Sequence, residues 1–214
     1  MQSQTSRFLL SGVALAAALA VTPARAESSN ALRFLAVGGS LASWATAFWN
    51  GAPLTDCANA RWQTRALLAR DGELNLLSAG AAYGDCQMLS MGGWTLSHQT
   101  SAMVGRWTAK GTVSGADSAW DVAVVPLLHW QRPAFGGHRM EVEVGVGPAW
   151  LSEPHIGDRY KSTQFQFSDH LGVNLVDGSG RWRVGLHWRH ISNLDIQTPN
   201  NGVDYAGVVL AWTL

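Results

Sequence analysis

Two runs of alternating apolar and polar residues near the carboxyl end constrain the fold of this chain most. Side chains of a β-strand point alternately to its two faces, so an alternating run predicts a strand with one apolar face. The apolar faces are formed by Trp182, Val184, Leu186 and Trp188 in the first run and by Val208, Leu210, Trp212 and Leu214 in the second. The segment between the runs contains the turn residues Asn and Gly, so the two strands are expected to form an antiparallel hairpin.

Three polar side chains interrupt the apolar faces of this hairpin. Extending each register toward the turn places His190 and Ser192 on the apolar face of the first strand and Asp204 on that of the second. If the turn is centred near Gln197, residue 190 lies opposite residue 204, and opposed side chains have Cβ atoms roughly 4.5–5.5 Å apart. Asp204 could then orient His190, and His190 could take the proton of Ser192, as in acyl hydrolysis. The alternative interpretation is that these are ordinary polar residues at strand ends, where aqueous loops begin.

The first 26 residues have the features of a secretory signal peptide. Arg7 provides a positive start, residues 8–21 are apolar, and Ala24-Arg25-Ala26 is a small-x-small cleavage signal. The alternative, an uncleaved membrane anchor, is disfavoured because the apolar run is short. We therefore expect a signal peptide over residues 1–26 and a single domain over residues 27–214.

The composition of the exported part favours a transmembrane β-barrel. No uninterrupted apolar segment of about 20 residues is apparent past the signal, so no transmembrane helix is expected. Charged residues make up only 14% of the chain, whereas Trp and Gly are frequent, which suits strands that face lipid. A secreted β-sandwich or a lipocalin-like barrel is the alternative. No basic stripe is present, so nucleic acid is not expected as a partner.

About eight strands are expected from the spacing of the alternating runs, which is the smallest standard outer-membrane barrel. Each clear strand has about 8 to 12 residues, enough for a tilted strand to cross a bilayer. Residues 61–70 fit a short helix or a strand equally well. Besides the final hairpin, strands are expected over residues 32–49, 73–83, 87–98, 103–110, 120–131, 140–146 and 165–175. The predicted fold class is all-β, an eight-stranded antiparallel transmembrane β-barrel.

The polar faces of these strands are expected to line a narrow, filled lumen. Carboxylates and guanidinium groups can pair there, because an unpaired buried charge is costly. The polar face carries Glu141, Glu143, Gln164, Gln166, His170, Asn174, Arg183, His187 and Arg189. A water-soluble barrel would reverse the two faces, but the signal peptide and the alternating apolar and aromatic residues of the last strand favour the membrane orientation.

The two cysteines, Cys57 and Cys86, could form a single disulfide in an oxidising compartment, or could remain two free thiols. No CxxC spacing is present, so a zinc site is not supported. His187 and His190 are three residues apart and point to opposite faces of a strand, so they cannot share a metal. No metal or cofactor is expected, because acyl hydrolysis of this kind needs none.

The hairpin resembles a known family. The segment His190-Ile191-Ser192-Asn193, followed by residues 199–204, resembles the carboxyl-terminal signature of the PagL-type lipid A 3-O-deacylases. In that signature an acidic residue follows the His by fourteen positions, which is the spacing from His190 to Asp204. Residues 165–172 and 142–147 are also similar to the family, and the resemblance extends over residues 120–214.

The resemblance implies a bacterial outer-membrane barrel whose active site faces lipid. It implies that His190 is the base, Ser192 the nucleophile and Asp204 the residue that orients the base. The implied reaction removes the ester-linked acyl chain at position 3 of lipid A, so lipopolysaccharide and outer-membrane lipid are the implied partners. Asn193 and Asn200 match asparagines of the motif and could contribute to an oxyanion site.

Two departures from the family pattern leave other functions open. The family acid is usually Glu, whereas Asp204 is shorter by one methylene, and Leu194 and Asp195 follow Asn193 where the family tends to carry a small residue. A non-enzymatic small barrel, structural or adhesive, is therefore the alternative function. A palmitoyl transferase shares the barrel but not the His-x-Ser spacing. A homodimer and the preferred acyl length are left open.

Overall fold

The structure, a computed structural model, describes residues 26–52, 57 and 60–214. The signal peptide predicted over residues 1–26 lies, except for Ala26, outside the described residues.

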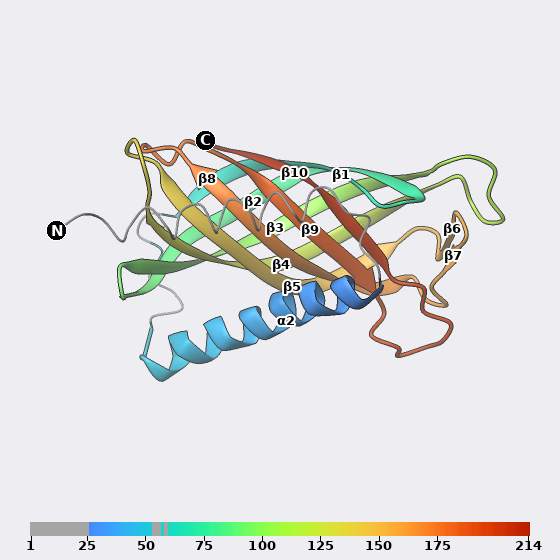
Figure 1. Cartoon of the computed structure of the whole chain (residues 1–214), viewed down its shortest axis with the longest axis horizontal. Helices are drawn as coiled ribbons and strands as arrows, with labels where there is room; N and C mark the ends of the chain where they lie inside the picture. Colours follow the sequence, from blue (N-terminus) through green and yellow to red (C-terminus); the bar gives the residue numbers. More distant parts are fainter. Residues whose placement is uncertain (1–25, 53–56, 58–59) are drawn as a thin grey trace.

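Eight antiparallel strands close into a barrel, as the alternating pattern predicts (Figure 1). Around the wall the strands follow the order β1-β10-β9-β8-β5-β4-β3-β2. The strands of the wall are β1 (Arg61–Arg70), β2 (Leu74–Met91), β3 (Trp94–Ala109), β4 (Ser118–Pro133), β5 (Arg139–Leu151), β8 (Phe165–Val176), β9 (Trp182–Ser192) and β10 (Val203–Thr213). Two short strands, β6 (His155–Ile156) and β7 (Arg159–Tyr160), pair with each other in the connection from β5 to β8.

Strand β2 is longer than its sequence pattern indicates. The sequence predicts separate strands over residues 73–83 and 87–98, but β2 is continuous. Gly84 and Asp85 have positive φ angles and coincide with a register shift against β3, so this site is a bulge and not a turn. The hairpin turn follows at Gly92-Gly93, where both residues have positive φ.

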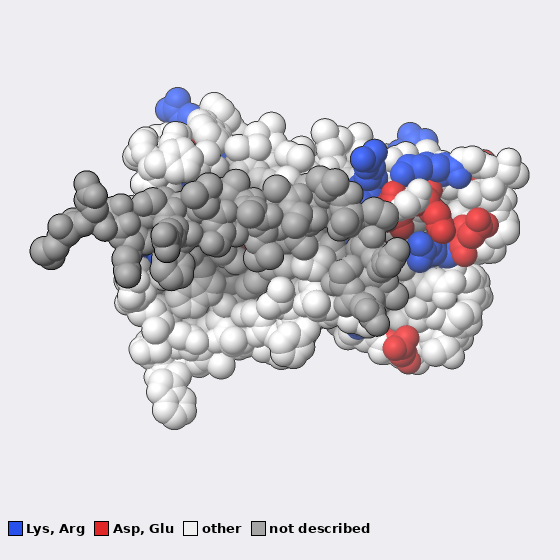
Figure 2. All heavy atoms as spheres, in the orientation of Figure 1, with Lys and Arg blue, Asp and Glu red and all other residues white. Residues whose placement is uncertain are grey.

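The apolar faces of the final hairpin point outward, as predicted. Leu210 and Trp212 are 55% and 48% exposed, and Trp182 and Val184 are partly exposed on the neighbouring strand. Most of the charged atoms visible in Figure 2 gather at the end of the barrel that carries β6 and β7. Such an apolar belt is the surface that a membrane-spanning barrel presents to lipid.

The lumen is filled by buried ion pairs, which confirms that the polar faces of the strands point inward. Arg65 Nη1 donates to Glu143 Oε2 at 2.8 Å, and Arg183 Nε lies 2.7 Å from Glu141 Oε1. Both pairs are almost completely buried. Ion pairs from β1 to β5 and from β9 to β5 therefore connect different parts of the barrel wall across the lumen.

We expect Arg65→Met to destabilise the barrel strongly, because it leaves the Glu143 carboxylate buried without its guanidinium partner. Breaking one side of a buried ion pair costs about 3–5 kcal/mol. Urea unfolding of the protein refolded in lipid vesicles, followed by Trp fluorescence, measures the change. The double variant Arg65→Met, Glu143→Leu removes both charges and should recover much of the loss; equal stabilities of the single variant and the parent would contradict the prediction.

A long helix, α2 (Ala26–Trp49), lies against the outside of the barrel (Figure 1). This corrects one expectation, since the sequence predicts a strand over residues 32–49. Residues 30–49 form a helix long and apolar enough, by length and composition, to span a membrane. Small and hydroxyl residues interrupt the apolar run of this segment, so its sequence pattern does not distinguish a helix from a strand.

The residues of α2 are arranged in the opposite way to those of a helix on a water-soluble protein. Its barrel-facing side is buried and carries mainly small residues, whereas its other side exposes large apolar ones. The buried residues are Leu32, Ala36, Ser40, Ser43 and Ala47; the exposed ones are Phe34, Leu35, Leu41, Phe48 and Trp49. Small residues at the contact let a helix approach its neighbour closely, as is common for helices packed in lipid.

Helix α2 packs along β5 and β8, and polar contacts attach it to β4 and β8. Ser43 Oγ accepts a hydrogen bond from Trp130 Nε1 at 2.8 Å, and Arg33 Nε lies 3.7 Å from Asp169 Oδ2. A Cβ on Gly39 would lie 3.2 Å from Val144 Cγ1, so the helix backbone lies close to β5. The helix is therefore part of the packed outer wall.

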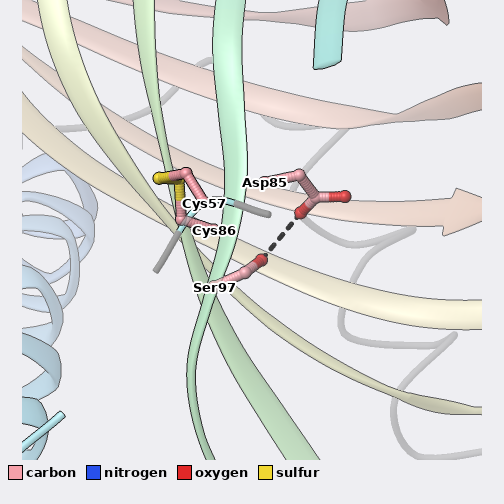
Figure 3. The surroundings of a disulfide bond; sticks show 4 residues. All are labelled: Cys57, Asp85, Cys86 and Ser97. Atoms are coloured by element: carbon pink, nitrogen blue, oxygen red, sulfur yellow. Dashed lines mark hydrogen bonds between the residues drawn. A yellow bond between two sulfur atoms is a disulfide. The ribbon is translucent and has the colours of Figure 1, made fainter. Parts of the chain in front are cut away.

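A disulfide joins Cys57 to Cys86 and resolves the choice between a bond and two free thiols (Figure 3). Cys86 lies on β2 beside the bulge, where Ser97 Oγ donates to Asp85 Oδ1 at 2.9 Å. The disulfide attaches the segment that follows α2 to the barrel wall.

The two ends of the barrel differ in the length of their connections. One end carries the connections over residues 110–117, 152–164 and 193–202, whereas the other has short turns, including Gly92-Gly93. Outer-membrane barrels have short periplasmic turns and longer extracellular loops. The predicted site, at the last residues of β9 and the first of β10, lies at the long-loop end.

Candidate active site

The β9–β10 hairpin has the register that the sequence predicts. Asp204 lies directly opposite His190, and Val203 lies opposite Ile191. In the connecting loop, residues 193–202, Leu194 and Asp195 adopt the left-handed region, at φ 56° and 59°. The backbone N–H of Asn193 donates to Asn200 Oδ1 at 3.1 Å, which closes the loop across its base.

The Asp204 carboxylate contacts the ring of His190. The two side chains are joined by a 2.8 Å contact between His190 Nδ1 and Asp204 Oδ1. Because a carboxylate can only accept, Nδ1 carries the proton, and Nε2 is left with its lone pair free to accept one. Asp204 therefore reaches the imidazole despite being one methylene shorter than Glu.

Ser192 lies on the same outer face of β9, two residues beyond His190, and is only 2% exposed. Neither Ser192 Oγ nor His190 Nε2 makes a hydrogen bond to any described residue. A Cβ built on Gly202 would lie 3.3 Å from His190 Nε2 and 3.5 Å from Ser192 Cβ. The two groups therefore flank one small space beside Gly202. A Ser192–His190 hydrogen bond is not formed here, and such bonds often tighten only when substrate is bound.

Gly202→Ala is expected to reduce hydrolytic activity by roughly 10²-fold, the scale of a misplaced catalytic group. The new methyl carbon would lie 2.8 Å from His190 Cε1, so the imidazole would have to shift from its present position beside Ser192. Steady-state hydrolysis of an ester substrate by the purified variant measures the effect. Gly72→Ala, in the β1–β2 turn, is the control, because a Cβ added there meets nothing within 4 Å. Unchanged activity of Gly202→Ala would show that the ring position tolerates displacement.

Two neighbours of His190 did not stand out in the sequence. Trp188 stacks on the imidazole, with ring centroids 5.8 Å apart and an interplanar angle of 15°. Asp169 lies opposite His190 on β8, so the ring has a carboxylate on either side. Counting residues across the β8–β9 turn pairs His190 with Asp169, just as counting across the β9–β10 turn pairs it with Asp204.

The two asparagines of the motif are held within the loop. Asn193 Nδ2 donates to the backbone oxygens of Lys161 and Gln197, both at 2.8 Å, and the side chain is fully buried. Asn200 Nδ2 donates to Asp195 Oδ1 at 3.0 Å. An oxyanion role stays a prediction for both residues, and for Asn193 it requires release of one of these bonds.

Among the residues that the structure describes, two clusters of possible metal ligands occur, and both lie in the lumen and not at the hairpin's outer face. They consist of Glu143, His170 and His187, and of His129, Glu141 and Glu143. Glu143 is already paired with Arg65, and His170 Nδ1 is 2.9 Å from His187 Nε2. We assign these side chains to the hydrogen-bond network of the lumen.

Comparison with known proteins identifies the same family as the sequence resemblance. A family model described as lipid A 3-O-deacylase (PagL) matches residues 78–213. A lipid A deacylase PagL from Bordetella bronchiseptica is 32% identical over 98 residues, which are 46% of this chain and 52% of the relative. One from Pseudomonas aeruginosa is 27% identical over 111 residues, or 49% of this chain and 62% of the relative. The chain thus spans about half to three fifths of the length of these relatives.

A solved structure has the same fold. The crystal structure of the outer membrane enzyme PagL superposes with a TM-score of 0.63 at 19% identity, covering 71% of this chain and 99% of that one. The part of this chain outside the family match includes α2 and β1. Since the family model matches well over half of the sequence, the chain belongs to the PagL family of lipid A 3-O-deacylases.

Proposed function

We propose that this protein is an outer-membrane esterase that hydrolyses the ester-linked acyl chain at position 3 of lipid A. The observation that carries the proposal is the 2.8 Å contact of Asp204 with His190, beside Ser192, on the outer face of a membrane barrel. A polar triad on a surface that faces lipid is energetically costly, so it tends to be functional. Membership of the family supplies the substrate class.

The site can perform both halves of an acyl transfer. Ser192 Oγ would attack the ester carbonyl carbon while His190 Nε2 takes the hydroxyl proton, and the Asp204 carboxylate would stabilise the imidazolium that forms. The proton then passes to the sugar oxygen as the ester C–O bond breaks, leaving the acyl group on Ser192. Water, deprotonated by His190, would attack the acyl-enzyme and release a fatty acid.

The position of the site suits a lipid substrate. The long-loop end is the expected extracellular end, so the site would face the outer leaflet. Exposed apolar side chains lie on the same outer face below it, including Val208 and Leu210. They offer a surface along which an acyl chain could lie while the ester reaches Ser192.

Mass spectrometry of lipid A tests the proposal. Lipid A from cells that produce this protein should lose one hydroxyacyl chain relative to cells that lack it. Purified protein in detergent, incubated with lipid A, should release the same chain, and this arm removes any restraint imposed by the intact membrane. Unchanged lipid A in both arms would favour a non-enzymatic barrel. Homodimer formation, which the sequence leaves open, is a separate matter that cross-linking in native membranes tests.

A further inference from the structure

Lys161 lies buried directly behind the candidate site. It follows β7 in the connection to β8 and is 0% exposed. Its Nζ donates to the backbone oxygens of Ile191 and Asn201, each at 2.9 Å. A lysine is rarely buried so completely, because its ammonium group loses hydration.

Both acceptors are parts of the site's framework. Ile191 stands between His190 and Ser192, and its side chain is buried in the apolar cluster of the lumen. Asn201 precedes Gly202, which lies against the imidazole and Ser192. One amine therefore connects the strand that carries base and nucleophile to the loop that borders them.

The backbone of Lys161 takes part in the same arrangement. Its carbonyl oxygen accepts a hydrogen bond from Asn193 Nδ2 at 2.8 Å, and its N–H donates to the oxygen of Pro154 at 3.0 Å. Nearby, Arg159 Nη1 donates to the oxygen of Gly202 at 3.2 Å. The hairpin loop is thus fixed to the β5–β8 connection on its inner side.

We propose that Lys161 is a positioning residue of the esterase site, holding the His190–Ser192 strand and the Gly202 loop at a fixed separation from inside the barrel wall. The inference rests on the proposed function of this site. Lys161 acts through backbone groups and does not touch the substrate. Its loss should lower kcat more than it raises KM, because the lipid-facing surface is left intact.

The positioning role depends on the N–H groups of the Lys161 amine more than on its positive charge. Burial, with a smaller effect of Arg159, lowers the pKa of Lys161 from 10.5 to about 7, although Asp204 and Asp71 act in the opposite direction. A neutral amine still has two N–H groups, which is the number of carbonyl oxygens it binds. The unfolded chain keeps this proton to higher pH than the folded chain, so the free energy of unfolding should rise with pH between about 7 and 10.5.

The sequence offers a matched control. Lys110 is the only other lysine, and its Nζ also donates to a backbone oxygen, that of Asp71 at 2.9 Å, at the same end of the barrel. It is exposed and remote from His190 along the wall. Lys161→Met should lower kcat by roughly 10- to 100-fold with KM changed little, whereas Lys110→Met should leave both near the parental values.

Chemical rescue tests the role of the amine itself. Both native cysteines are in the disulfide, so Lys161→Cys introduces one free thiol. The non-reduced variant is unfolded in urea, alkylated with either 2-bromoethylamine or 1-bromopropane, and refolded in detergent. The two products have side chains of equal length, with and without the amine. The aminoethyl product should recover most of kcat, and the propyl product should not.

The outcomes separate the two proposals. If the parent hydrolyses lipid A but Lys161→Met or the propyl product has full kcat, the positioning role is wrong. If the propyl product fails to refold while the aminoethyl product refolds, Lys161 serves folding and the positioning role is likewise overturned. If the parent itself hydrolyses no lipid A, the proposed function fails first.

Discussion

Ser192→Ala should abolish deacylation while leaving the barrel folded. The hydroxyl is the proposed nucleophile, and removal of one member of such a triad costs roughly 10⁴-fold or more in rate. Its Oγ makes no hydrogen bond to the described residues, so its removal leaves no partner unsatisfied there. Release of fatty acid from lipid A by the purified variant, measured by mass spectrometry, gives the rate.

A serine on the same barrel provides the control for this variant. Ser90 lies on β2 at the short-turn end, far along the wall from β9, and Ser90→Ala should hydrolyse lipid A like the parent. Folding of both variants is checked by circular dichroism. Near-parental activity of Ser192→Ala would place the nucleophile elsewhere, for example on a water molecule activated by His190.

Asp204→Asn should lower kcat by roughly 10²- to 10⁴-fold and leave the barrel intact. The amide can keep a hydrogen bond to Nδ1, but the charge that stabilises the imidazolium is lost. If the Asn side chain turns its NH₂ toward the ring, the imidazole adopts the other tautomer and Nε2 can no longer accept a proton. Asp204→Glu restores the usual family residue and should retain activity.

Asp169 is the matched comparison for Asp204, since it flanks His190 on the opposite ladder. Its carboxylate lies 3.7 Å from Arg33 and makes no hydrogen bond to a described side chain. Asp169→Asn should therefore cost much less activity than Asp204→Asn. The reverse order of activities would make Asp169 the orienting residue and remove Asp204 from the triad.

The hairpin could be predicted because its information is local. A period of two gives the face of each residue, and a turn centre gives the partner, so His190 and Asp204 follow from counting. The lumen follows from the same alternation. The rule fails where residues depart from regular strand geometry. Gly84 and Asp85 look like turn residues in the sequence, but they form a bulge within β2, where both have positive φ angles.

The remaining parts of the site depend on contacts between distant segments. Lys161 lies in an irregular connection, and nothing in its neighbourhood along the chain shows that its amine will reach Ile191 and Asn201. Helix α2 could not be predicted from the sequence, because its small residues resemble those of a weak strand unless the barrel surface on which they pack is known. Both features are set by tertiary packing, which overrides local preference.

Helix α2 makes the surroundings of the catalytic face asymmetric. On one side of β9 it lies along β8 and β5, and its Leu32 and Ala36 cover Trp188. On the other side, the paired Leu68 and Val208 of β1 and β10 are exposed. A lipid diffusing within the leaflet would meet a protein wall when it arrives from the β5 side and an open surface when it arrives from the β1 side. Lipid A would therefore reach Ser192 from the β10–β1 side of the hairpin, and the product would leave on that same side.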